Sequence, residues 1–267
     1  MEGLYLYCIR EKTDTHCFST KGIDGREEVF VIPLQELEAV VSNVPIEEFA
    51  SEEIQKKAKE DLSWIKERAF AHEKVIEEAM GKDDKVLSLI PMGFGTIFKG
   101  KARLEEALNK DYLRIREVLD RIRGNWEWSV KVYLTDREKF VQVIDKSEAI
   151  EKKKEEIASL PEGMAFFMEE ELKEVISREM KKELDSTAEV FFECLKRQAV
   201  DATKCKILEK ELTGRREPMV LNAAYLISEE KIEDFKKAAE TLNQQTQANG
   251  FCLEYSGPWP AYNFTSY

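Results

Sequence analysis

The 267-residue chain has few of the side chains that usually bind metals. It contains two histidines, His16 and His72, and neither has a second histidine or a cysteine at a spacing typical of metal ligands. The five cysteines are odd in number and scattered, with no C-x-x-C pair, which argues against a disulfide framework and a zinc site. We therefore expect no metal, no cofactor and no cysteine chemistry.

These sparse residues are better explained as parts of the protein interior. His72 lies beside the apolar stripe of a predicted helix, which favours a hydrogen-bonded, partly buried histidine over a catalytic one. Cys8, Cys205 and Cys252 have apolar neighbours and are expected to act as small core hydrophobes. None of these residues is predicted to react.

Long apolar runs and an excess of positive charge are also absent. No uninterrupted apolar run approaches the ~20 residues that a membrane helix needs, and residues 1–10 lack the basic start and long apolar core of a signal peptide. The chain has 41 basic and 53 acidic side chains, a net charge of −12, whereas binding to nucleic acid depends on clustered Lys and Arg. We expect a cytoplasmic protein with neither a membrane nor a nucleic acid as partner.

Catalytic motifs are missing as well. Gly93 and Gly95 are not followed by the third glycine of a dinucleotide-binding fingerprint, and the Lys of a phosphate-binding P-loop is absent, so a tight strand-to-helix connection explains both glycines. Carboxylates are abundant, but no spacing selects one pair as a general acid and base. We predict that the protein is not an enzyme.

The first half of the chain predicts a mixed α+β arrangement. Apolar runs indicate strands at residues 4–9, 29–32 (ended by Pro33), 37–42 (ended by Asn43 and Pro45) and 86–90. Helical spacing indicates helices over residues 54–80 and 104–122, the latter closed by Gly124.

The second half has elements in an order typical of a known plan. The predictions are a strand at 126–134, a solvated helix or linker at 145–156, a long helix from 163 to about 198, strands at 203–208 and 219–227, a helix capped by Ser228, and a strand at 251–255. The strand, long helix, strand, strand, helix, strand order is that of the split-βαβ or ferredoxin-like fold, with two helices on one face of an antiparallel sheet.

The predicted fold class is therefore α+β with two domains. We place an N-terminal α+β domain at residues 1–124, a ferredoxin-like domain at 125–255, and a C-terminal tail at 256–267.

The tail combines prolines with aromatic side chains. Two prolines between residues 256 and 264 prevent a regular helix, and three aromatic residues offer a large apolar surface: Trp259, Tyr262 and Phe264. These rings either fold back onto the protein's own core or form a contact surface for a hydrophobic partner. We name the three residues as candidate partner contacts.

Four segments of the chain resemble the gas vesicle GvpF/GvpL family. They are LYLY at residues 4–7, PMGFGTIF at 91–98, GNWEWSVKV at 124–132 and GPWPAYNF at 257–264, and they occur in the family's order along the whole chain. The sequence differs from the usual family pattern at Ala261, Gly93, Glu169 and Glu170. These differences leave the F or L subgroup open.

The resemblance implies a non-enzymatic accessory or minor structural protein of the gas vesicle. It implies two α+β domains, the second ferredoxin-like, and partners that include the small hydrophobic major shell protein and other gas vesicle accessory proteins. A shell subunit with exposed β edges and apolar patches aggregates unless these are covered. We therefore expect a chaperone-like assembly factor that binds the shell subunit, prevents its aggregation and supports vesicle nucleation.

Two other functions are compatible with the sequence. An α+β protein of this kind can be a small-molecule-binding regulator or an enzyme, because ferredoxin-like domains have many functions. It can also be a scaffold that binds only other accessory proteins.

Overall fold

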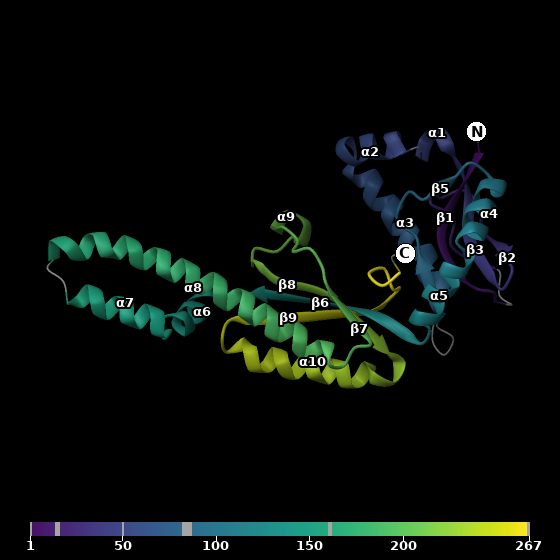
Figure 1. Cartoon of the computed structure of the whole chain (residues 1–267). Helices are drawn as coiled ribbons and strands as arrows, with labels where there is room; N and C mark the ends of the chain where they lie inside the picture. The colour runs from purple at the N-terminus through teal and green to yellow at the C-terminus, as the bar shows by residue number, and fades with distance from the viewer. Residues whose placement is uncertain (1, 14–16, 50, 82–86, 160–161, 266–267) are drawn as a thin grey trace. The chain divides into compact units, whose positions relative to one another are not determined.

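The computed structural model describes residues 2–13, 17–49, 51–81, 87–159 and 162–265 (Figure 1). The chain forms a mixed α+β fold with two antiparallel sheets. It divides into two compact units, one made of Met1–Glu127 with Pro258–Tyr267 and the other of Trp128–Gly257. Among the described helices, none has both the length and the apolar composition that crossing a membrane requires.

The first sheet is built around a completely buried central strand. Gly3 to Arg10 are all buried in β1, which pairs with β3 on one side and with β4 and β5 on the other, in the order β2-β3-β1-β4. The strands are β1 (Glu2–Glu11), β2 (Val29–Leu34), β3 (Leu37–Pro45), β4 (Leu89–Pro91) and β5 (Ile97–Phe98).

Two strand ends predicted from the sequence are wrong. Pro33 does not end its strand, because it lies within β2 opposite Glu38. The strand β2 is at the edge of the sheet, where a residue without an N–H is tolerated. Asn43 and Pro45 likewise lie inside β3, opposite Leu4 and Glu2 of β1.

The predicted helices of this half are each divided in two. Asp61 interrupts the helix expected over residues 54–80, because its side chain accepts a hydrogen bond from the backbone N–H of Trp64 and so begins a new helix. Asp111 separates the two pieces of the second helix. The helices are α1 (Ile46–Phe49), α2 (Ser51–Glu60), α3 (Leu62–Met80), α4 (Lys101–Lys110) and α5 (Tyr112–Ile122).

The second sheet has four strands in the order β7-β8-β6-β9. The strands are β6 (Asn125–Leu134), β7 (Asp201–Lys204), β8 (Met219–Ser228) and β9 (Phe251–Trp259). The helical segments between them are α6 (Arg137–Ile144), α7 (Glu148–Ala158), α8 (Glu162–Lys196), α9 (Lys210–Thr213), the 3₁₀ turn η1 (Glu229–Lys231) and α10 (Ile232–Gln247).

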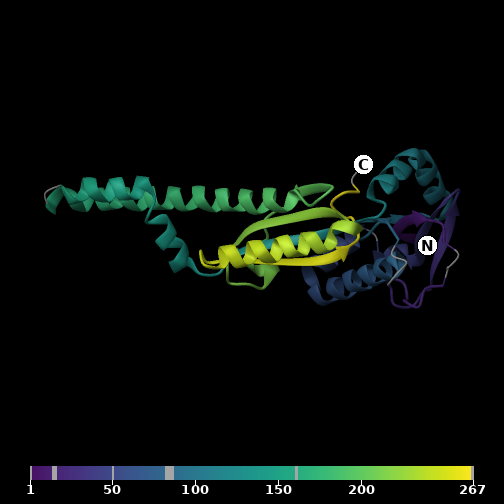
Figure 2. The ribbon, with the colours of Figure 1, turned by 90° about the horizontal axis from the view of Figure 1, so that it is seen from below.

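Aromatic side chains fill the space between this sheet and its helices. Helices α8 and α10 contact each other and β8, and they lie next to each other in Figure 2. The ring of Phe251 in β9 lies 5.4 Å from that of Phe140 in α6 and 6.2 Å from that of Phe191 in α8. The ring of Phe235 in α10 lies within 6.0 Å of Trp128 and 5.6 Å of Tyr225.

The charged segment at residues 145–156 is helical rather than a linker. It forms α7, which runs along α8 (Figure 1), and Lys153 of α7 lies 2.8 Å from Glu171 of α8. Helix α6 was not predicted from the sequence. The strand predicted at 203–208 extends too far, because β7 ends at Lys204. The predicted cap Ser228 makes no side-chain capping bond.

Candidate functional site

The C-terminal tail follows β9 into the first compact unit. The strand extends past the predicted end at Tyr255 to Trp259, and the chain then turns tightly. The backbone N–H of Tyr262 donates to the carbonyl of Pro260 at 2.7 Å, and that of Phe264 donates to Ala261 at 3.1 Å. The tail is therefore a folded segment with a defined course.

The three tail aromatics named from the sequence differ in exposure. Trp259 is 39 % exposed, Tyr262 is half-buried, and Phe264 is only 5 % exposed. For Phe264 the structure shows packing inside the first unit, which is the alternative to partner contact. Trp259 presents the accessible aromatic surface of the tail.

Hydrogen bonds to residues distant in the sequence hold the tail in place. The hydroxyl of Tyr262 donates to Glu73 of α3 at 2.8 Å. The backbone N–H and the side-chain amide of Asn263 donate to the two carboxylate oxygens of Glu127 in β6, at 2.8 and 2.6 Å. Arg121 of α5 donates to the carbonyl of Phe264. We call these contacts the tail clasp.

The carboxylates of the tail clasp are removed from water. Glu127 is 5 % exposed, and burial raises its pKa, an effect that the two hydrogen bonds from Asn263 partly offset. Burial also raises the pKa of Glu73, and the bond from Tyr262 acts against it. Neither carboxylate was predicted from the sequence, and for Glu127 the reason is that the alternation of residues 126–134 places it on the solvent side of its strand.

His72 belongs to a buried hydrogen-bond chain. Its Nε2 lies 3.1 Å from the carbonyl of Met92, which can only accept, so Nε2 carries the proton and Nδ1 accepts from the Tyr5 hydroxyl at 3.0 Å. The Tyr5 hydroxyl accepts in turn from the backbone N–H of Gly95 at 2.8 Å. Burial lowers the pKa of His72 to about 4, so the ring is neutral at pH 7.

This arrangement confirms a hydrogen-bonded histidine, although His72 is fully rather than partly buried. It also fixes the loop that contains Gly93 and Gly95 against β1. His16 lies outside the described residues. Among the residues that the structure describes, no group of three or more His, Cys, Asp or Glu side chains could hold a metal ion.

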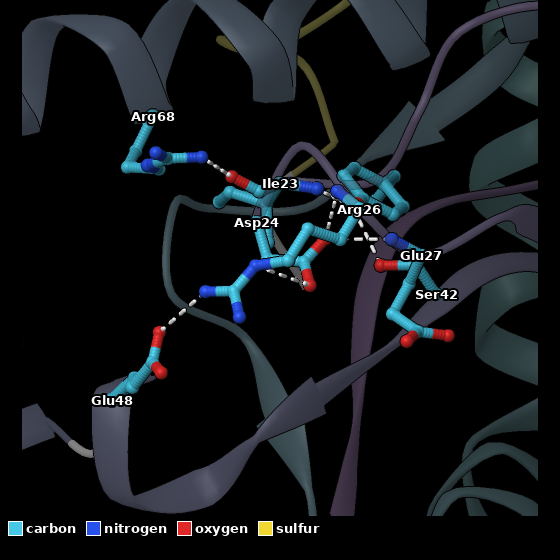
Figure 3. Close-up of polar contacts among 8 residues, drawn as sticks. Ile23, Asp24, Arg26, Glu27, Ser42, Glu48 and Arg68 are labelled. Atoms are coloured by element: carbon cyan, nitrogen blue, oxygen red, sulfur yellow. Dashed lines mark hydrogen bonds and ion pairs between the residues drawn. The ribbon is translucent and has the colours of Figure 1, made fainter.

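The loop before β2 is fixed by a second set of bonds (Figure 3). The carboxylate of Asp24 accepts from the backbone N–H groups of Arg26 and Glu27, at 2.9 and 3.0 Å. The side chain of Arg26 points to Glu48 at 3.4 Å, and Arg68 donates to the carbonyl of Ile23 at 2.6 Å. These bonds are those of a structural turn.

A buried ion pair joins the sheet to α3. Arg10 of β1 and Glu38 of β3 are 4 % and 1 % exposed, and their side chains meet at 2.8 Å. Arg10 also donates to the backbone carbonyl of Ala79. Both side chains are buried, so the pair joins β1, β3 and α3 in the interior.

A groove on the first unit is lined by few groups that could take part in a reaction. It has a volume of about 530 Å³ and lies between β2 and the start of α4, lined by residues that include Phe30, Val31 and Lys101. None of Tyr5, His72 and Glu127 lines it. These buried titratable groups thus lie apart from the groove, in the interior and in the tail clasp.

The cysteines have different environments. Cys8 is fully buried, which confirms the core prediction, and burial raises its pKa to about 12. Cys205 and Cys252 are half-buried.

Known proteins resemble this chain over most of its length. It is 24 % identical to gas vesicle protein F1 of Halobacterium salinarum over 263 residues, covering 98 % of this chain and 92 % of that protein. It is 27 % identical to gas vesicle protein F of Nostoc sp. over 66 % of this chain and 68 % of that protein.

Solved structures show the same fold. The crystal structure of GvpF from Anabaena sp. aligns with a TM-score of 0.78 and 21 % identity, covering 100 % of this chain and 99 % of that one. GvpF from Microcystis aeruginosa aligns with a TM-score of 0.69 and 19 % identity, covering 99 % of both chains. Residues 3–266 match the family described as gas vesicle synthesis protein GvpL/GvpF, and the chain therefore belongs to this family of gas vesicle proteins.

Proposed function

We propose that this protein binds the major gas vesicle shell subunit, keeps it competent for assembly and supports nucleation of the wall, without catalysing a reaction. The single observation that carries this proposal is the exposure of Trp259, 39 %, on a tail whose neighbouring residues are held in place. A large rigid aromatic side chain presented in this way is a typical centre of a protein interface.

The partner's chemistry supports the proposal. The wall of a gas-filled compartment needs a strongly apolar inner face, so its free subunits aggregate through apolar patches and β edges. A partner with a net charge of −12 stays soluble while its aromatic surface covers such a patch. The protein would then act in the cytoplasm and at the growing vesicle, together with other accessory proteins.

We also interpret the chain as folding in separate domains, residues 1–124 and 125–255, followed by a tail from residue 256. The strand order β7-β8-β6-β9 supports a ferredoxin-like second domain, because it places β8 between β6 and β7 as in a split βαβ unit.

Light scattering tests the main proposal. Shell subunit is diluted from denaturant with and without the protein, and we expect the protein to slow the rise in scattering and to co-elute with the subunit. Unchanged aggregation with no complex would overturn the proposal. If pull-downs then captured only other accessory proteins, the chain would be a scaffold.

Two tail variants separate binding from folding. Trp259→Ala is expected to weaken shell-subunit binding by at least tenfold, the effect of removing a central interface aromatic, while circular dichroism stays that of the wild type. Phe264→Ala is expected to destabilise the first unit by about 3–5 kcal/mol, because it empties a buried site. Equal effects of the two variants on stability would show that Trp259 also has a core role.

A further inference from the structure

The hairpin of β2 and β3 determines which backbone groups of β2 are free. Only Gln35 and Glu36 connect the strands, and Leu34 pairs with Leu37. In a two-residue hairpin this closing pair is hydrogen-bonded, and the pairs alternate from there. The N–H and C=O groups of Val31 consequently point away from β3, as do those of Val29 and the carbonyl of Pro33.

These groups lie on the open edge of the sheet. The order β2-β3-β1-β4 leaves β2 without a neighbour on its outer side. Within the described ranges, the backbone hydrogen bonds made outside the strands and helices include none to Val29 or Val31. The edge therefore has unused donors and acceptors, which is the requirement for adding a strand.

The groove described above touches residues 30–33 of this edge strand and extends over the sheet to Gly3 and Leu4 of β1 and Asn43 of β3. Phe30 and Val31 are half-buried in it, and Gly100 and Lys101 at the start of α4 line it as well. A Cβ added to Gly100 would meet no atom within 4 Å, so the groove is open there. Its volume of about 530 Å³ can hold several apolar side chains of an extended peptide.

The two edges of the second sheet are better protected. Strand β7 has four residues and carries Asp201 and Lys204, whereas β9 carries Glu254 and Pro258. Short length, charge and proline all discourage pairing with another strand. Residues 29–32 of β2 are Val, Phe, Val and Ile, with Pro33 only at the far end.

The charges at the groove indicate what binds there. Its charged lining residues are Glu2 and Lys101, of opposite sign, so the groove is neutral in a chain of net charge −12. A groove without net charge, lined by Leu4, Phe30, Val31 and Ile32 beside outward-pointing backbone groups, complements an uncharged extended segment with apolar side chains. It does not complement a basic or acidic peptide.

We propose that β2 binds an extended apolar segment of the shell subunit by strand addition, with backbone bonds at Val31 and apolar side chains in the groove. This inference rests on the proposed function, and it names the surface and the form in which the partner binds. It also places a second contact on the first unit, in addition to Trp259.

The test uses the shell subunit kept in solution as a fusion to a carrier protein. Val31→Pro removes the outward N–H at a position where an edge strand tolerates proline, and Val31→Thr keeps that N–H and the β-branched shape. We expect Val31→Pro to weaken binding by at least tenfold and Val31→Thr by less than about twofold. If Val31→Pro does not fold, amide exchange in the wild-type protein replaces it, and the Val31 amide should become protected when the fusion binds.

The outcomes separate the two proposals. Wild-type binding that Val31→Pro leaves unchanged, or a Val31 amide that stays unprotected in the complex, would overturn strand addition at β2 and leave the proposed function standing. No binding by the wild-type protein would overturn both. Concentration-dependent dimers of the protein alone that Val31→Pro abolishes would show that a second copy occupies the edge, and would also overturn this proposal.

Discussion

The interiors of the two compact units differ in their content of buried polar side chains. Of the buried polar and charged side chains among the described residues, only Asn222 belongs to the second unit; the others are Arg10, Asp24, Glu38, Ser42, His72, Glu127 and Thr265. Rings pack against rings in both units, but those of the first unit include the buried, hydrogen-bonded Tyr5 and His72, whereas those of the second pack between its sheet and helices.

This difference has consequences for specificity and for pH. Apolar packing is non-directional and tolerates exchange of side chains of similar volume, whereas a buried polar group is costly unless its partner is present. The first unit should therefore respond strongly to loss of single hydrogen-bond partners and to protonation. The second unit should be destabilised mainly by substitutions that remove buried side-chain volume.

The largest expected effect is that of removing an aromatic side chain from the core of the second unit. Phe191→Ala should lower the free energy of unfolding of the second unit by about 3–5 kcal/mol, because Phe191 is fully buried against Phe251. The neighbouring exposed residue gives the control, and Val190→Ala should cost about 0.5 kcal/mol or less. Amide exchange of β8 measures both, and equal effects would contradict the assignment of the core.

Variants of the buried ion pair Arg10–Glu38 test how strongly the first unit depends on its polar contacts. Arg10→Met should cost about 3–5 kcal/mol in chemical denaturation, because it leaves the carboxylate of Glu38 buried without its partner. The double variant Arg10→Met/Glu38→Leu should recover most of this loss. Lys21→Met removes an exposed pair with Glu28 and should cost about 1 kcal/mol at most. If the double variant were no more stable than the single one, loss of packing would be the cause.

His72 should make the first unit sensitive to acid. Its folded-state pKa of about 4 is below the ordinary 6.5, so its contribution is complete above pH 6.5 and is lost as the pH falls from 6.5 to 4, by about 3 kcal/mol. Urea unfolding at pH 7 and pH 4 measures this change. His72→Gln does not titrate in this range, and its stability should change less; parallel pH profiles would contradict the buried neutral ring.

The two carboxyl groups with raised pKa values, Glu73 and Glu127, change stability with pH in the opposite direction to His72. Because the pKa values of Glu73 and Glu127 are higher in the folded state, each contributes stability at acid pH that is lost as the pH rises through its folded-state pKa. Both groups are present in the wild type and in His72→Gln, so the difference between the two proteins isolates the histidine.

The tail clasp should show a smaller, coupled effect. Glu127→Ala removes the acceptor of both hydrogen bonds, and Asn263→Ala removes only the side-chain donor, so a double-mutant cycle should give a coupling of about 1–3 kcal/mol for the side-chain bond. Amide exchange of Phe264 in the four proteins reports whether the tail stays docked. Strict additivity would show that the side-chain bond between Asn263 and Glu127 does not stabilise the docked tail.

The difference between apolar packing and buried polar contacts also explains which features could be predicted from the sequence. Apolar periodicity indicated the strands and long helix of the second half, because burial there follows the 2- and 3.6-residue repeats. It did not indicate that Glu127 would be buried, since its partner Asn263 is 136 residues away. Trp259, Tyr262 and Phe264 were all predicted from the sequence as candidate contacts. Only the folded structure shows that Trp259 is exposed and Phe264 is buried.

The affinity of the shell subunit for Trp259→Ala tests the central claim most directly. Binding of the soluble shell-subunit fusion is measured for the wild type, for Trp259→Ala and for Leu113→Ala, which removes another exposed apolar side chain from the first unit. We predict at least tenfold weaker binding for Trp259→Ala and wild-type binding for Leu113→Ala, with all three proteins folded. Wild-type affinity in Trp259→Ala would contradict a shell-binding role for the tail.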